Sequence, residues 1–197
     1  MAEKRTTTVV IGPTASGKTA WAIELAKKTG AAVISADSRQ VYSGLNIGTA
    51  KPEEAWRDEP HDILESDIID TVPHYLLNIA APNTAYTLAS WQAAAQNVLQ
   101  HLEHAGLPAV LAGGTMLYVD SILFNYTIPE VQPDPVLRAE LAKLSAEELW
   151  PQLMQKDPAA QQFIEPHHKQ RIIRALEVIT AMGKPFSDLR QKRPSPY

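Results

Sequence analysis

The chain has 197 residues, of which 45% are hydrophobic and 20% are charged, and its formal net charge is −4. This composition is typical of a globular α/β domain and excludes a disordered chain. The chain lacks an apolar run of about 18 residues, so we expect no membrane span. It has no cysteine, which excludes disulfide scaffolds and cysteine-bound zinc. Because the N-terminus also lacks the apolar stretch of a signal peptide, we expect a soluble, cytoplasmic protein.

Three short apolar runs predict strands, and helical patterns lie between and after them. The predicted strands are Thr6–Ile11, Ala31–Ser35 and Leu107–Ala112. The predicted helices are one ending at Thr29 before Gly30, one over Leu88–His104 with Thr87 as its N-cap, and one ending near Phe124. This alternation predicts a parallel sheet flanked by helices. Residues 36–82 are acidic and rich in proline, which predicts loop and short helix.

After residue 128 the sequence predicts short helices, each marked by its first residues. Asp134-Pro135 and Asp157-Pro158 each place an N-cap before a proline, and Ser145 with Glu148 forms a capping box. A longer helix is expected over His167–Met182, ending at Gly183. We therefore expect an α/β core over residues 1–127, a small inserted helical domain over 128–166, and a helix returning to the core with a C-terminal tail over 167–197.

The strongest chemical signal is a glycine-rich loop between the first strand and its helix. It reads Gly12-Pro13-Thr14-Ala15-Ser16-Gly17-Lys18-Thr19. The glycines let the backbone wrap around phosphates, the amides at the helix start supply donors, and Lys18 adds a positive charge. The Thr19 hydroxyl is the usual Mg²⁺ ligand of such a loop. The motif predicts a phosphate or nucleotide site, and a diphosphate ester fits it as well as ATP does.

Two polar segments follow the second and third strands, at the edge where open α/β sheets bind ligands. Asp37 follows the second strand, where a carboxylate can hold Mg²⁺, orient a hydroxyl or accept a proton. Gly113-Gly114-Thr115 follows the third strand, where a diglycine allows close backbone approach and Thr115 can donate a hydrogen bond. The alternatives are that Asp37 caps a helix and that the diglycine segment is a tight turn with a cap.

The last predicted helix carries Arg171 and Arg174 three residues apart, a spacing that suits a joint grip on phosphate. A solvated helix face explains the same pair, and it also explains the basic character of residues 167–197. His167 and His168 are adjacent and cannot share one helix face, so metal binding by this pair is not expected.

In this order the motifs resemble those of the bacterial tRNA dimethylallyltransferase family, from Val9 to about Leu189. The segments that carry the resemblance are Gly12–Thr19, Ser35–Tyr42, Gly44–Pro52, Gly113–Tyr118, Asp157–Pro158 and Arg171–Glu177. The resemblance implies a P-loop NTPase-like parallel sheet flanked by helices, with a small inserted all-helical domain. It also implies transfer of a dimethylallyl group from its diphosphate to N6 of the adenosine beside the tRNA anticodon, with release of diphosphate.

We expect the chain to be a monomer. The resemblance further implies roles for individual residues. The loop from Gly12 to Thr19 would hold the diphosphate with Mg²⁺ at Thr19, and Asp37 and Thr115 would be catalytic. Asp37 would take the proton of the adenine amine. To reach the site, the adenosine would have to be flipped out of its stack. The implied contacts to the tRNA anticodon stem-loop are Asp37, Ser38, Arg39, Gln40, Thr115, Arg138, Gln170, Arg171, Ile172, Ile173 and Arg174.

The sequence departs from the family in three places. Pro166-His167-His168 stands where Pro-Asn-Asp is usual, and Asn78 stands where an aspartate is common after the His-x-Leu step. Family members usually continue for roughly another hundred residues beyond this point, about the size of a small domain. We therefore expect either a fragment or a naturally short form.

Three other functions remain open. The first is a small-molecule P-loop kinase in which Asp37 orients an acceptor hydroxyl. The second is an enzyme that prenylates free adenine nucleotides, and the third is a catalytically silent nucleotide- or RNA-binding module.

Overall fold

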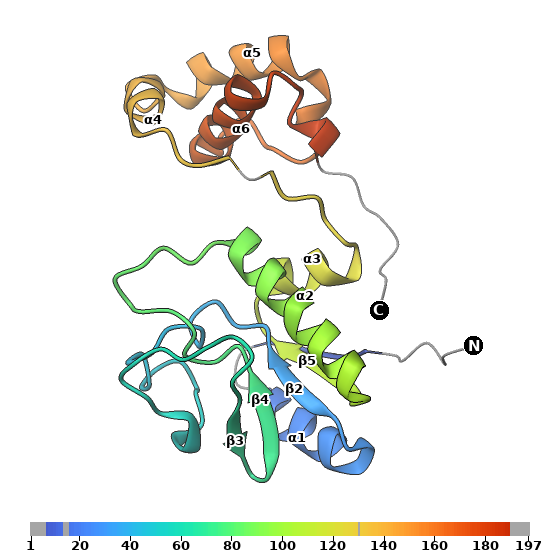
Figure 1. Ribbon diagram of the computed structural model, residues 1–197. Helices are drawn as coiled ribbons and strands as arrows, with labels where there is room; N and C mark the ends of the chain where they lie inside the picture. The colour runs from blue at the N-terminus through green and yellow to red at the C-terminus, as the bar shows by residue number, and fades with distance from the viewer. Residues whose placement is uncertain (1–6, 14–15, 130, 190–197) are drawn as a thin grey trace, which may run out of the picture. The chain divides into compact units, whose positions relative to one another are not determined.

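The computed structural model describes residues 7–13, 16–129 and 131–189 (Figure 1). The chain divides into two compact units, an α/β unit that ends at Asn125 and a helical unit that begins at Tyr126. No helix among the described residues is long and apolar enough to cross a membrane.

The α/β unit is built on a five-stranded sheet with the order β1-β5-β2-β4-β3. Its strands are β1 (Thr8–Ile11), β2 (Ala32–Ser35), β3 (Asp67–Ile69), β4 (Val72–Tyr75) and β5 (Ala109–Gly113). β1, β5, β2 and β4 are parallel, and β3 pairs antiparallel with β4. Because β5 lies between β1 and β2, the loops after these three strands meet at one edge of the sheet.

The β3–β4 hairpin corrects the prediction of loop and short helix over residues 36–82. The segment also contains a 3₁₀ helix, η1 (Glu53–Ala55), as expected. Asp70 and Thr71 form the hairpin turn with φ of 48° and 70°, the left-handed pair that a two-residue turn requires. Strands of three and four residues are too short to show a period, and Pro73 within β4 argues against a strand in the sequence.

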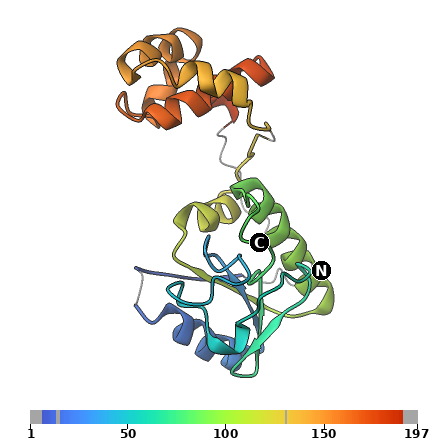
Figure 2. The ribbon, with the colours of Figure 1, turned by 90° about the vertical axis from the view of Figure 1, so that its left-hand side faces the viewer.

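Helices cover both faces of this sheet: α1 (Lys18–Thr29) packs on one face, and α2 (Leu88–Ala105) and α3 (Met116–Leu123) pack on the other (Figure 1, Figure 2). Neighbouring residues of one strand divide between the two cores, with Val33 on the α1 side and Ile34 on the α2 side. Thr87 caps α2 by accepting from the Ser90 amide, as predicted. Trp91 of α2 is fully buried, and its Nε1 donates to the Ser35 carbonyl at 3.2 Å, which anchors the end of β2.

The helical unit contains α4 (Pro135–Leu141), α5 (Ala146–Lys156), η2 (Pro158–Gln162), α6 (Lys169–Met182) and η3 (Ser187–Leu189). The Asp134 cap and the Ser145–Glu148 capping box are both present. Asp157 differs from its prediction: its carboxylate accepts from the Ser187 amide and hydroxyl, at 2.8 and 2.7 Å, instead of capping η2.

α6 belongs to the helical unit, which differs from the expected helix returning to the core. Its buried face, with Ile172 and Leu176, packs with Leu149 and Leu153 of α5 in one apolar cluster. α5 is amphipathic, and burying its apolar face requires a partner helix, which α6 supplies. Residues 190–197 of the expected tail lie outside the described residues.

Candidate active site

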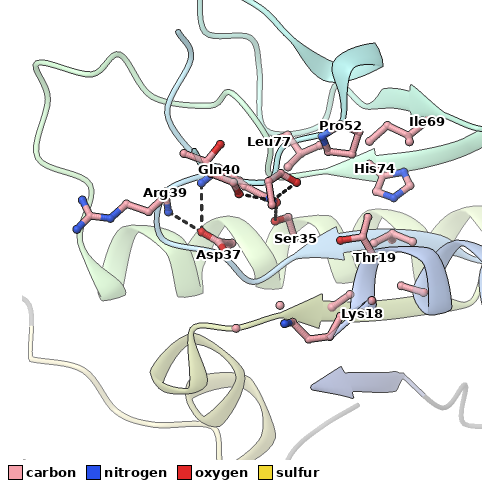
Figure 3. Close-up of a pocket in the computed structure, with 18 of the residues that line it drawn as sticks. Lys18, Thr19, Ser35, Asp37, Arg39, Gln40, Pro52, Ile69, His74 and Leu77 are labelled. Carbon is pink, nitrogen blue, oxygen red and sulfur yellow. Dashed lines mark hydrogen bonds between the residues drawn. The ribbon is translucent and has the colours of Figure 1, made fainter. Parts of the chain in front are cut away.

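A pocket of about 430 Å³ lies in the α/β unit, where the loops after β1, β2 and β5 meet (Figure 3). Its polar lining includes Lys18, Thr19, Asp37, Gln40 and His74. Its apolar lining comes from the sheet, from α1 and from loops, and it includes Ala22, Val33, Pro52, Ile69, Leu77 and Ala112. The pocket therefore offers a charged, hydroxyl-bearing part beside an apolar surface, a combination that suits an amphiphilic ligand.

The predicted phosphate loop lies at this pocket, through Ser16, Gly17, Lys18 and Thr19. Gly17 is the N-cap of α1 with φ of 79°, and it has no side chain to occupy the first amides of the helix. These amides and the positive end of the helix dipole favour an anion here. Lys18 Nζ donates to the Pro13 carbonyl at 2.5 Å, so the ammonium lies against the loop. Thr14 and Ala15 lie outside the described residues.

Asp37 lines the pocket and also closes the turn that follows β2. Its Oδ1 accepts from the amides of Arg39, at 2.8 Å, and Gln40, at 3.3 Å (Figure 3). The carboxylate thus caps a turn and not a helix, whereas a helix cap was the alternative that the sequence left open. The Arg39 side chain extends away from Asp37, Lys18 and Thr19.

Gln40 connects β2 to the segment that forms another wall of the pocket. Its Oε1 accepts from the Ser35 hydroxyl at 3.0 Å, and its Nε2 donates to the carbonyls of Thr49 and Ala50 at 3.1 and 3.2 Å. Thr49 and Ala50 line the pocket with Gly48 and Pro52. The Gln40 side-chain amide therefore positions this wall. The resemblance implied a tRNA contact for Gln40 and did not indicate this role.

The diglycine segment after β5 approaches the end of β2 very closely. A Cβ on Gly113 would lie 2.1 Å from the Ala36 carbonyl oxygen, so only glycine fits there. Thr115 donates its amide to the same carbonyl at 3.1 Å, and its hydroxyl accepts from the Ser38 amide at 3.0 Å. Thr115 does not cap α3 with its side chain. It joins the β5 loop to the turn that carries Asp37, while Gly113 and Gly114 line the pocket itself.

His74 is a pocket residue that the sequence reasoning missed. It lies on β4, is 3% exposed, and its Nε2 has no hydrogen-bond partner among the described residues. Burial lowers the pKa of His74, although its contact with the Val72 carbonyl opposes this. The neutral ring that results donates from Nδ1 to that carbonyl at 2.9 Å, which leaves Nε2 as an acceptor. A histidine within an unrecognised strand gave no signal beyond the His-x-Leu step.

Asn78, the departure noted in the sequence, is fully buried in a polar network. Its Oδ1 accepts from Lys51 Nζ at 2.6 Å, and its Nδ2 donates to the Ala55 carbonyl and to Asp67 Oδ2, at 2.8 and 3.1 Å. Asp67, which also pairs with Arg57, supplies the buried carboxylate of this network. Burial lowers the pKa of Lys51, an effect that Asp67 partly offsets. An amide at position 78 therefore fits its site, because Asp67 on β3 supplies the carboxylate of the network.

Two of the predicted tRNA-contacting arginines bind a carboxylate within the helical unit. Arg138 donates to both oxygens of Glu177, at 2.7 and 2.8 Å, and Arg174 donates to Oε2 of the same residue. Burial raises the pKa of Glu177, but hydrogen bonds from Arg138, Arg174 and the Asp134 amide outweigh it and lower this pKa to about 2. The joint grip of Arg171 and Arg174 on phosphate is therefore not preformed, because Arg174 is held by Glu177.

The remaining residues of the predicted α6 segment divide by exposure. Gln170 and Arg171 are exposed, whereas Ile172 and Ile173 are 0% and 4% exposed and lie in the apolar cluster of the unit. The side chains of Ile172 and Ile173 therefore pack the helical unit, which corrects their prediction as contacts.

A phosphate loop between β1 and α1, with a carboxylate after the neighbouring strand β2, defines a P-loop NTPase-like α/β protein. The sequence model described as IPP transferase matches residues 40–197, and the model described as isopentenyl transferase matches residues 6–59. The chain belongs to the IPP transferase family.

Curated relatives and solved structures agree with this assignment. A tRNA dimethylallyltransferase of Thermosynechococcus vestitus is 43% identical over 189 residues, covering 96% of this chain and 57% of the relative. One from Roseiflexus is 42% identical over 95% of this chain and 59% of its own length. The crystal structure of a tRNA isopentenylpyrophosphate transferase from Bacillus halodurans is 34% identical with a TM-score of 0.56, covering 93% of this chain and 58% of that one.

A eukaryotic dimethylallyltransferase acting on tRNA shares the fold, with a TM-score of 0.74 at 24% identity, over 95% of this chain and 46% of that one. The chain thus spans a little more than half the length of the curated relatives it matches.

Proposed function

We propose that this chain carries the catalytic pocket of a tRNA dimethylallyltransferase. The observation that carries the proposal is one pocket with a phosphate loop, the carboxylate of Asp37 and an apolar surface that includes Val33 and Leu77. A prenyl diphosphate needs an anion site and an apolar site side by side. The family and the names of the relatives support this donor and tRNA as the acceptor.

The donor's diphosphate would bind at the start of α1. The amides after Gly17 supply hydrogen bonds, and Lys18 would exchange its contact with the Pro13 carbonyl for a phosphate oxygen. The same groups stabilise the charge that grows on the diphosphate as it leaves. The apolar lining takes the five-carbon chain, and this stabilises the bound donor by removing apolar surface from water.

The residues at the loop also fit Mg²⁺. The Thr19 hydroxyl lines the pocket with the Asp37 carboxylate, and both offer the hard oxygen atoms that Mg²⁺ prefers. We propose that Thr19 holds the ion. When bound, Mg²⁺ would neutralise part of the negative charge of the diphosphate.

Asp37 would act as the general base for the acceptor adenosine. The adenine N6 attacks the allylic carbon of the donor, the carbon–oxygen bond breaks with its electron pair going to diphosphate, and Asp37 accepts the proton lost from N6. An exocyclic amine is a poor nucleophile, so its placement matters greatly. The bonds from Asp37 to the amides of Arg39 and Gln40 fix the carboxylate for this purpose. The base must leave its stack to reach the pocket.

The helical unit would hold the anticodon stem-loop, with Gln170 and Arg171 as exposed contacts. Arg138 and Arg174 are 42% and 36% exposed while bound to Glu177, so each guanidinium keeps an open side for a phosphate. Because tRNA is the proposed acceptor, the cytoplasm is the proposed location.

The experiment uses labelled dimethylallyl diphosphate and Mg²⁺ with three acceptors. They are an anticodon stem-loop with the target adenosine, the same loop with guanosine at that position, and free AMP. Label on the adenosine stem-loop alone is expected, and Asp37→Ala should abolish it while donor binding remains. Asp188→Ala, at an exposed carboxylate of the helical unit, is the matched control. Label on AMP would identify an adenine-nucleotide prenyltransferase.

Two results would refute the transferase activity of this chain. Donor bound without label on any acceptor would indicate a silent binding module. Phosphate transfer from ATP to a small molecule, without prenyl transfer, would indicate a kinase.

A further inference from the structure

The turn that precedes α6 gathers three side chains with metal-ligating atoms. Glu165, His167 and His168 each offer one atom, and these atoms lie within 4.8 Å of one another. Glu165 Oε2 lies 3.2 Å from His167 Nε2 and 3.6 Å from His168 Nδ1. The two imidazole rings have centroids 4.3 Å apart. Among the described residues this is the one such group of three or more.

The two separations that involve Glu165 are close to the edges of a coordination tetrahedron. With zinc–nitrogen and zinc–oxygen bonds of about 2.0–2.1 Å, two ligand atoms at the tetrahedral angle lie about 3.3 Å apart. The distances from the Glu165 oxygen to the two histidines fall on either side of this value. A small side-chain rotation would therefore bring all three atoms around a single ion.

A second observation points to a missing ligand at the same place. The Nδ1 atom of His168 is buried and has no hydrogen-bond partner among the described residues. A buried polar nitrogen without a hydrogen-bond partner destabilises the folded chain, because it has lost its contact with water. Coordination of a cation would satisfy this nitrogen.

Metal binding by this pair was not expected from the sequence, because adjacent residues cannot share one helix face. The structure removes that objection: His167 and His168 precede α6, which begins at Lys169, so helical geometry does not apply to them. Lys169 is the nearest cation along the chain, and its Nζ is bonded to the Ala142 carbonyl at 2.7 Å. The dipole of α6 disfavours a positive ion at the start of the helix, but three ligands outweigh this effect.

We propose that Glu165, His167 and His168 form a Zn²⁺ site, with water as the fourth ligand. Two imidazoles and one carboxylate are a donor set for zinc rather than for Mg²⁺, which prefers oxygen ligands throughout. The ion would fix the turn before α6 and thereby the first residues of that helix, where Gln170 and Arg171 are exposed. The site is independent of the proposed transferase activity, because it needs only residues of this turn.

The test is a calorimetric titration of the untagged, chelator-treated chain with Zn²⁺ in excess Mg²⁺. Excess Mg²⁺ occupies oxygen-only sites such as the one proposed at Thr19. One equivalent of Zn²⁺ should bind, and His167→Asn with His168→Asn should weaken it more than about tenfold, since both nitrogen ligands are lost. Co²⁺ bound in place of Zn²⁺ should show the intense visible bands of four-coordinate geometry.

The matched control is His101→Asn with His104→Asn, two exposed histidines one turn apart on α2. This variant loses the same number of imidazoles and should bind Zn²⁺ like the parent chain. Circular dichroism of both variants checks that the fold is retained. Absence of one-equivalent binding, or equal loss in the two double variants, would overturn the proposal.

Discussion

Lys18 in the α/β unit and the arginines around Glu177 in the helical unit show two different uses of a positively charged side chain. Among the described residues, Lys18 Nζ has one hydrogen-bond partner, the Pro13 carbonyl of the loop, and Lys18 lines the pocket. In the helical unit, Arg138 and Arg174 are both bound to Glu177, a carboxylate that is 1% exposed. A cation on a backbone carbonyl can be taken over by an anionic ligand, because the carbonyl bears no net charge. A cation paired with a buried carboxylate mainly stabilises its own unit.

The largest effect on donor binding should come from Lys18→Ala. Removing the ammonium should weaken binding of dimethylallyl diphosphate at least a hundredfold, about 2.7 kcal/mol, because a charge-assisted hydrogen bond to the diphosphate is lost. Calorimetric titration with the donor measures it. Lys28→Ala, at an exposed position on the same helix, should leave donor binding unchanged. Equal loss in both variants would mean that the effect is general charge rather than the phosphate loop.

Gly113→Ala should destabilise the α/β unit by about 2–4 kcal/mol, because the new methyl group would overlap the Ala36 carbonyl. Gly114→Ala is the matched control: its methyl group would meet Lys18 Nζ at 4.0 Å, an ordinary contact, and should cost less than about 1 kcal/mol. Urea unfolding followed by tryptophan fluorescence gives both values. Similar stability of the two variants would show that the β5 and β2 loops separate easily.

Glu177→Gln should destabilise the helical unit by about 2 kcal/mol, because Arg138 and Arg174 lose the carboxylate that binds them. Both arginines are partly exposed, so water replaces part of this interaction and limits the loss. Hydrogen exchange of peptides from α6 measures the loss, and peptides from α2 serve as an internal reference. Glu140→Gln, at an exposed carboxylate on α4, should change neither. Full protection of α6 in Glu177→Gln would show that apolar packing alone holds the unit.

The same carboxylate predicts an acid-sensitive helical unit. Folding lowers the pKa of Glu177 from 4.5 to about 2, so the charged group stabilises the fold above pH 4.5. This contribution should disappear as the pH falls from about 4.5 to about 2. Protection of α6 amides, relative to the intrinsic exchange rate at each pH, should fall more over this range in the parent chain than in Glu177→Gln, which has no carboxylate to protonate there.

The smallest effect should come from Thr115→Val. The hydroxyl accepts from the Ser38 amide beside Asp37, so its loss should loosen the turn and lower turnover about tenfold with little change in stability. Thr115→Ser, which keeps the hydroxyl, should restore turnover. If Thr115→Val lowers kcat far more than about tenfold, then the hydroxyl contacts the reacting groups directly.

The phosphate loop, the helix caps at Thr87 and Ser145 and the strands β1, β2 and β5 were predictable because each depends on neighbours in sequence. The hairpin was not, because β3 and β4 gain their stability from pairing with each other and with β2. His74 was missed for the same reason, since its place in the pocket follows from the strand that carries it. Asn78 departs from the family pattern in sequence, and its partner Asp67 comes beside it only through the fold.

The sequence by itself determined the family, the α/β core and the phosphate loop, because contiguous residues form that loop and its chemistry is local. Only the tertiary structure decided which polar groups line the pocket and which bind other residues of the chain. It gave Gln40 to the pocket wall, Arg138 and Arg174 to Glu177, Ile172 and Ile173 to the helical core, and His167 and His168 to a common point with Glu165. These assignments depend on partners brought together by folding and on burial, neither of which spacing along the chain reveals.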